Sequence, residues 1–225
     1  MKTRFLPWLL ALPALLLAGC ALTGAGPGSP LGTAPSYLTS INDAVPNAAA
    51  LTHRIYTPGL DAGYVPQGLA SAGGYLFVSS YLPTPDLKSS TGPCRVFRIE
   101  IASGRAAGHI DLPAGACTHA GGLAALPNDY LFLADTRALF LIDLQRALPA
   151  ASSVGASKSV QIGGQLRGSF GTFDGQYAWI GTWTKDPAKA RMFRLDPNLF
   201  ERYDGQSVQE DSRLRGNDRP PPTRE

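Results

Sequence analysis

The stretch QGLASAGGYLFV at residues 67–78 decides the fold, because the chain repeats it. A second copy, GGLAALPNDYLFL, occupies residues 121–133 and starts 54 positions later. A third and less similar copy, GSFGTFDGQYAWI, occupies residues 168–180 and starts 47 positions after the second. Self-similarity at a period of about 50 residues indicates a repeat architecture.

Each copy predicts one blade of antiparallel strands. The glycine-rich start suits an inner strand whose backbone approaches its neighbours closely. Turn residues then separate it from a second strand, and a third apolar strand follows in each copy, at residues 96–99, 139–142 and 192–195. Four short strands in about 50 residues match a β-propeller blade. With 25 Gly and 19 Pro in 225 residues, the composition also favours an all-β fold with many turns.

Three segments carry a resemblance to known propellers: Pro66 to Ala70, His119 to Ala124 and Trp179 to Trp183. The pattern resembles the NHL, YWTD and gluconolactonase-like six-bladed propellers. It is more similar still to poorly characterised secreted bacterial propellers. The resemblance covers residues 55 to 200 and implies a fold, whereas propellers host unrelated chemistries.

The number of copies predicts an incomplete propeller. We expect about three blades, at 64–113, 117–164 and 166–200, within a folded region at 37–200, whereas a closed propeller has four to eight. Residues 201–225 lose the apolar pattern and are expected to be a disordered tail. Within it, residues 211–218 resemble translated DNA repeats found between bacterial genes. The tail is therefore either a reading frame that runs into such a repeat or a natural polar tail.

The N-terminus predicts a bacterial lipoprotein. Lys2 and Arg4 precede a short apolar stretch at residues 5–17, as in a secretory signal. The following Leu17-Ala18-Gly19-Cys20 resembles a lipobox, which implies a signal peptide at 1–19, lipid on Cys20 and a flexible tether at 20–36. Residues 21 and 22 are not Asp, which favours the outer membrane over the inner one. An ordinary secretory signal with an incidental cysteine is the alternative.

The two remaining cysteines, Cys94 and Cys117, form an even pair in an exported chain, where disulfides persist. Both are placed near one rim of adjoining blades, so we expect a disulfide, although two free thiols remain open. A zinc site is disfavoured, because the sequence has no Cys-x-x-Cys and only three histidines. We predict neither a metal nor a cofactor.

Three residues are candidates for a ligand site at the channel rim, because each precedes or begins an inner strand: Gln67, His119 and Ser169. Asp135 follows a second strand, where a carboxylate more often caps the turn than binds a cation. Tyr81 and Trp183 hold similar positions and either pack between blades or line a ligand surface. The chain lacks a Gly-x-Ser-x-Gly elbow, a Walker loop and a dinucleotide fingerprint, so no catalytic set is predicted.

These features predict a membrane-anchored periplasmic or surface lipoprotein whose blades bind a protein or small-molecule partner on the rim, without catalysis. The alternative is a lactonase-like or esterase-like hydrolase with a divalent cation in the channel, which would need converging carboxylate or amide ligands. Without Lys2 and Arg4, the chain has 18 basic and 17 acidic residues (20 minus 2, against 17). Such a balance predicts no nucleic-acid partner.

Overall fold

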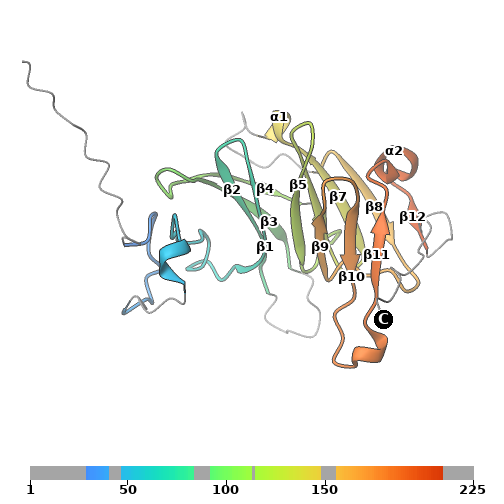
Figure 1. Cartoon of the computed structure of the whole chain (residues 1–225), viewed down its shortest axis with the longest axis horizontal. Helices are drawn as coiled ribbons and strands as arrows, with labels where there is room; N and C mark the ends of the chain where they lie inside the picture. The colour runs from blue at the N-terminus through green and yellow to red at the C-terminus, as the bar shows by residue number, and fades with distance from the viewer. Residues whose placement is uncertain (1–28, 41–46, 84–91, 113–114, 148–155, 210–225) are drawn as a thin grey trace, which may run out of the picture.

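The computed structural model describes residues 29–40, 47–83, 92–112, 115–147 and 156–209. Its strands form three separate sheets that lie side by side as an open fan (Figure 1). None of the described sheets closes on itself, and most neighbouring strands are antiparallel. The fold is therefore all-β and resembles an incomplete propeller, as predicted.

The three sheets follow the three sequence copies. The first contains β1 (Val65–Ala72), β2 (Tyr75–Tyr81), β3 (Cys94–Glu100) and β4 (Ala106–Asp111) in that order. The second contains β5 (Gly122–Leu126), β6 (Tyr130–Ala134), β7 (Ala138–Asp143) and β8 (Lys158–Ile162), and the third β9 (Phe170–Phe173), β10 (Ala178–Gly181) and β11 (Met192–Leu195). The remaining elements are short: 3₁₀ turns at Ala48–Ala50 and Pro187–Lys189, and helices α1 (Leu144–Ala147) and α2 (Leu199–Tyr203).

Turn residues lie where the sequence predicted them. Gly73 and Gly74, between β1 and β2, have φ of 55° and 82°. Asn128 and Asp129, between β5 and β6, both have φ of 61°, which Asn and Asp tolerate better than most residues. These left-handed conformations let each second strand fold back on its inner strand.

The inner strands β1, β5 and β9 touch through backbone, so their small residues are a packing requirement. A Cβ added to Gly122 would lie 2.0 Å from the backbone nitrogen of Gly171. A Cβ on Gly68 would lie 2.6 Å from the nitrogen of Leu123. Both distances are far below van der Waals contact, so larger residues at these glycines would force the sheets apart.

Two apolar clusters form the core, one in each seam between sheets. The first seam includes Phe77, Val96, Leu133 and Phe140. The second includes Phe132, Ile180, Leu195 and Phe200. The predicted blades therefore pack through their faces, and the core consists of these two layers.

Two predicted boundaries are wrong. Residues 201–225 were expected to be a disordered tail, with the folded region ending at residue 200. Instead, β12 (Ser207–Val208) pairs in parallel with β8, and Val208 is buried. The second sheet thus gains a fifth strand, whereas the third sheet has three described strands in place of the four predicted. The tether prediction at 20–36 also extends too far, because Leu31 forms a parallel bridge with Ile55. Residues 210–225, with the repeat-like stretch, lie outside the described residues.

Candidate functional site

A hollow of about 660 Å³ opens where the inner strands begin, and it brings together all three residues predicted for the rim. Its lining comes from all three sheets and the loops before them. The lining residues are Gln67, His119, Thr136, Arg167, Ser169, Thr182 and Trp183. Since no single sheet supplies more than part of this set, the fan arrangement creates the hollow.

The turns after β6 and β10 also supply lining residues. Thr136 follows β6, and Trp183 follows β10. In the first sheet, Tyr81 ends β2 and stacks on His119, with ring centroids 4.6 Å apart. The repeat therefore places one side chain per blade at or beside the hollow.

Of the two uses expected for Trp183, packing between blades or lining a ligand surface, the structure shows the second. Its side chain is 70% exposed and lines the hollow. An indole in that place offers an apolar face to a ligand while its N–H can still donate a hydrogen bond.

Asp135 fixes the loop that carries His119. Its Oδ1 accepts hydrogen bonds from the backbone N–H groups of Thr118, His119 and Ala120, at 3.0, 2.6 and 2.9 Å. The carboxylate is fully buried, and a buried charge is tolerated when it is hydrogen-bonded in this way. The expected cap of the turn after β6 is limited to one long hydrogen bond, from the Arg137 N–H to Oδ2 at 3.4 Å, so the main role of Asp135 is to hold the loop before β5.

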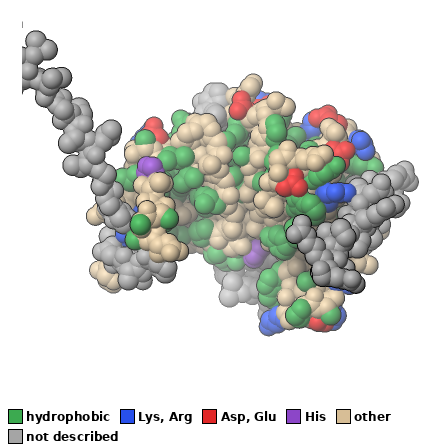
Figure 2. All heavy atoms as spheres, viewed as in Figure 1, with side chains coloured by type: hydrophobic (Ala, Val, Ile, Leu, Met, Phe, Trp, Pro, Cys, Tyr) green, Lys and Arg blue, Asp and Glu red, His purple; other side chains and the backbone are tan. Residues whose placement is uncertain are grey.

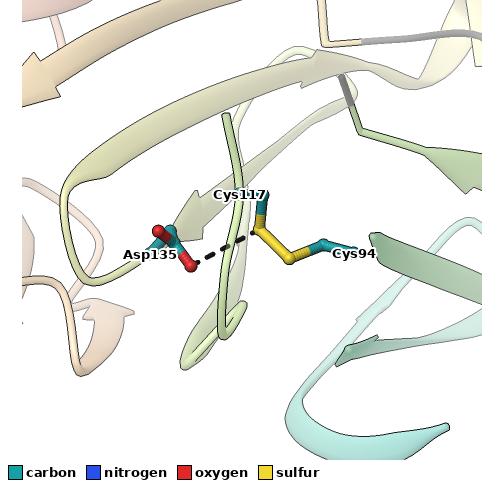
Figure 3. A group of neighbouring side chains, drawn as sticks. All are labelled: Cys94, Cys117 and Asp135. Carbon is teal, nitrogen blue, oxygen red and sulfur yellow. Dashed lines mark hydrogen bonds between the residues drawn. A yellow bond between two sulfur atoms is a disulfide. The ribbon is translucent and has the colours of Figure 1, made fainter. Parts of the chain in front are cut away.

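Cys94 and Cys117 are joined by a disulfide that ties β3 of the first sheet to the loop before β5, with Cα atoms 5.7 Å apart. Asp135 lies beside them (Figure 3), and the potential ligand atoms of the three side chains all lie within 4.8 Å of one another. A disulfide sulfur is not a thiolate, so the set offers a metal only the Asp135 carboxylate. For the same reason, the 3.4 Å contact from Cys117 Sγ to Asp135 is a close packing contact without a shared proton.

Sequence reasoning missed three residues of the hollow: Thr136, Arg167 and Thr182. Arg167 donates from Nη1 to the carbonyl oxygens of Gly164 and Leu166, at 2.8 and 2.6 Å. Burial, and next the charge of Arg137, lower the pKa of Arg167. The Thr182 hydroxyl is buried and has no hydrogen-bond partner among the described residues.

The signal for Thr182 was present in the repeat, because it holds the position of Asp135 in its own copy. For Arg167 the sequence offered only its place two residues before Ser169.

The predicted lipid site, Cys20, and the signal peptide at 1–19 lie outside the described residues. Within the part of the chain that the structure describes, no helix has the length and apolarity needed to cross a membrane.

Comparison with known proteins adds little. No known family and no curated protein matches the chain. Among solved structures, apo AztD from Citrobacter koseri is similar with a TM-score of 0.33 and 12% identity, over 60% of this chain and 45% of that one. The chain thus spans less than half the length of that protein. The functional proposal therefore rests on the residues that line the hollow.

Proposed function

We propose that this chain is a lipid-anchored envelope protein that binds a small polar ligand in the hollow where its inner strands begin. The observation behind the proposal is that Gln67, His119 and Ser169, from three different sheets or their leading loops, line one hollow. Its volume of 660 Å³ falls within the range of about 300 to 1,000 Å³ common for ligand pockets.

The lining suits recognition of a polar ligand with one flat or apolar face. Trp183 provides an exposed ring, and the amide of Gln67 and the hydroxyls of Thr136, Ser169 and Thr182 both donate and accept hydrogen bonds. Thr182 is of special interest, because a buried hydroxyl without a partner costs free energy that a ligand's hydrogen bond would recover.

Binding is favoured over the hydrolase alternative by the chemistry of the described lining. A channel-bound divalent cation takes six to eight oxygen ligands when it is calcium, with carboxylates prominent among them. The nearest buried carboxylate, Asp135, already accepts three backbone hydrogen bonds in the loop before β5. Its oxygens hold the loop and do not converge with Gln67 on a cation.

Native mass spectrometry of the chain, extracted from membranes in a mild detergent, tests the binding function. The wild-type chain should carry an added small-molecule mass, and Trp183→Ala should lose it. Trp179→Ala is the matched control, since Trp179 lies outside the hollow and donates from Nε1 to Asp174 at 2.7 Å. An added mass retained in Trp183→Ala, or none in the wild type, would contradict the proposal.

The lipid anchor is supported by the complete lipobox Leu17-Ala18-Gly19-Cys20, and the residues after it favour the outer membrane. Several acyl chains would hold the protein firmly, since each buried CH₂ contributes about 0.8 kcal/mol. Metabolic labelling with radioactive palmitate should mark the wild type, and Cys20→Ala should lose both the label and membrane retention. Labelling that persists in Cys20→Ala would refute the anchor.

A further inference from the structure

A second hollow adjoins the first and is lined mainly by cationic side chains. It measures about 290 Å³ and lies between the loop before β9 and the β10 to β11 connection. Its lining residues are Gln165, Arg167, Thr182, Lys189 and Arg191. Arg167 and Thr182 line both hollows, so the two form one continuous surface.

From this arrangement we propose that the second hollow is an anion subsite that holds an oxyanionic group, such as a phosphate, of the ligand bound in the first. The inference rests on the proposed binding function and names the chemical class of its ligand: a small molecule with a polar body and a phosphate-like end. Guanidinium groups suit this role, because their planar N–H donors match the geometry of oxyanions.

The backbone holds both arginines in place. Arg191 Nη1 donates to the carbonyl oxygens of Ala188 and Ala190, at 2.8 and 2.7 Å, and Arg167 Nη1 is held in the same way by its own loop. Each guanidinium has five N–H donors, so the donors of Nε and Nη2 can serve a ligand. Side chains that are already fixed lose little conformational entropy when they bind an anion.

Lys189 adds a third cation that can reorient at small cost. It pairs with Asp186 at 3.5 Å, but both side chains are exposed, at 77% and 48%. Exposed pairs of this kind contribute at most about 1 kcal/mol, so an incoming oxyanion can compete for the ammonium group. In Figure 2, basic side chains are visible at the edges of the projecting β10 to β11 connection, with acidic and hydrophobic side chains between them.

Among the described ion pairs, only that of Lys189 with Asp186 brings a carboxylate to this cluster. Burial of Arg167, and next the positive charge of Arg137 on the turn after β6, lower the pKa of the Arg167 guanidinium. The buried Thr182 hydroxyl between the two hollows has no described partner and can donate to an oxyanion. An anion bound here would relieve the repulsion and satisfy the hydroxyl in one step.

Isothermal titration of the purified full chain with inorganic phosphate tests the subsite. Phosphate should bind saturably and more weakly as salt is raised. Affinity should fall about tenfold or more in Arg167→Gln and in Arg191→Gln, since each loses charge-assisted hydrogen bonds. Arg105→Gln is the matched control: this arginine is 65% exposed, pairs with Glu100 on the first sheet and should leave affinity unchanged.

Two further variants keep the outcome clear. Lys189→Gln changes an exposed side chain, cannot disturb the core and should still weaken phosphate binding several-fold. Trp183→Ala should leave phosphate affinity unchanged while it abolishes retention of the small molecule. A wild type that does not bind phosphate saturably, or arginine variants that bind it normally, would overturn the subsite even if the first hollow holds a ligand.

Competition identifies the source of the oxyanion. Displacement of phosphate by soluble glycerol phosphate, and not by detergent micelles containing phosphatidylglycerol, is the expected result and assigns the group to a soluble ligand. Displacement by the micelles alone would overturn that assignment in favour of a lipid headgroup.

Discussion

The two ends of the fan differ in what covers their outer faces. On the first sheet, Ile55 and its neighbours face β1 to β3 across a hollow of about 450 Å³, in whose lining Leu69 stays 62% exposed. Beside it, Tyr64 packs edge-on against Phe97 with ring centroids 5.3 Å apart. On the third sheet, Phe170 and Met192 stay 42% and 56% exposed. Figure 2 shows hydrophobic side chains among polar ones over β9 to β11. A segment N-terminal to the first blade thus partly covers the outer face of the first sheet, which a neighbouring blade would cover in a closed propeller.

The ends are also attached differently to the central sheet. A disulfide and the Ser79 hydroxyl, which accepts from Gly68 N–H and donates to the Ala120 carbonyl, link the first sheet to the second. The third sheet is held by apolar packing in which α2 takes part. One end therefore depends on its cover and a covalent link, and the other on a short helix near the end of the described chain.

The largest effect is expected from removing the cover. Deleting residues 29–57 would expose Val78 and Ile99, which are now 6% and 1% exposed, because it removes Ile55 and the other residues that face them across the hollow. Each such side chain contributes about 1.5 to 3 kcal/mol when buried, and a domain has only about 5 to 15 kcal/mol in total. We expect the midpoint of thermal unfolding to fall steeply or the transition to lose cooperativity. Circular dichroism would measure the midpoint and the cooperativity of this transition. A transition unchanged by the deletion would show that residues 29–57 do not contribute to stability.

The second effect concerns α2 at the other end. Phe200 is 1% exposed and meets Phe132 edge-on at 6.2 Å, so Phe200→Ala should lower the free energy of unfolding by about 3 to 5 kcal/mol. Truncation after residue 209 should leave stability unchanged, whereas truncation after residue 200 should lower it, because Val208 and the pairing of β12 with β8 are lost. Urea unfolding separates these outcomes. Equal stability of both truncated chains would mean that α2 beyond residue 200 and β12 contribute nothing to stability.

The third effect tests the covalent link. Replacing both Cys94 and Cys117 with Ala opens a loop of sequence separation 23 and should cost about 3 kcal/mol, since the unfolded chain regains freedom. The loss should appear as a lower urea midpoint, and the oxidised and reduced wild type should differ by a similar amount. If peptide mass spectrometry of unreduced protein finds two free thiols at these positions, the first seam is held by packing alone.

The repeat made the fold predictable, because its signals are local. Glycines such as Gly122, and turn residues such as Asn128, mark an inner strand and a hairpin wherever they occur. The predicted rim residues were found for the same reason, since each holds a set position at the start of a copy. A periodic sequence thus predicts the strands of each blade and the hollow residues that lie at the start of each copy.

Features that depend on distant contacts could not be found in this way. β12 has only two residues, Ser207 and Val208, and its pairing with β8 joins positions 46 apart (208 minus 162). The cationic hollow needs Arg167 from one loop and Arg191 from another, each of which looks like an ordinary surface arginine in the sequence. Only the packing of the third sheet on the second brings such groups together.

The smallest effect on stability, and the sharpest test of the bare end, is Met192→Lys. The side chain is 56% exposed, so the change should shift the free energy of unfolding by no more than about 0.5 kcal/mol. Self-association should nevertheless fall, because exposed apolar area on an uncovered sheet face favours contact with another molecule. Light scattering after size exclusion should show association of the wild type that weakens in Met192→Lys. Tyr37→Lys, which changes a residue 63% exposed in the segment N-terminal to the first sheet and away from both sheet faces, is the matched control and should leave association unchanged. A wild type that is monomeric and unfolds cooperatively at all concentrations would mean that the third sheet needs no further blade, and the incomplete-propeller interpretation of that end would then fail.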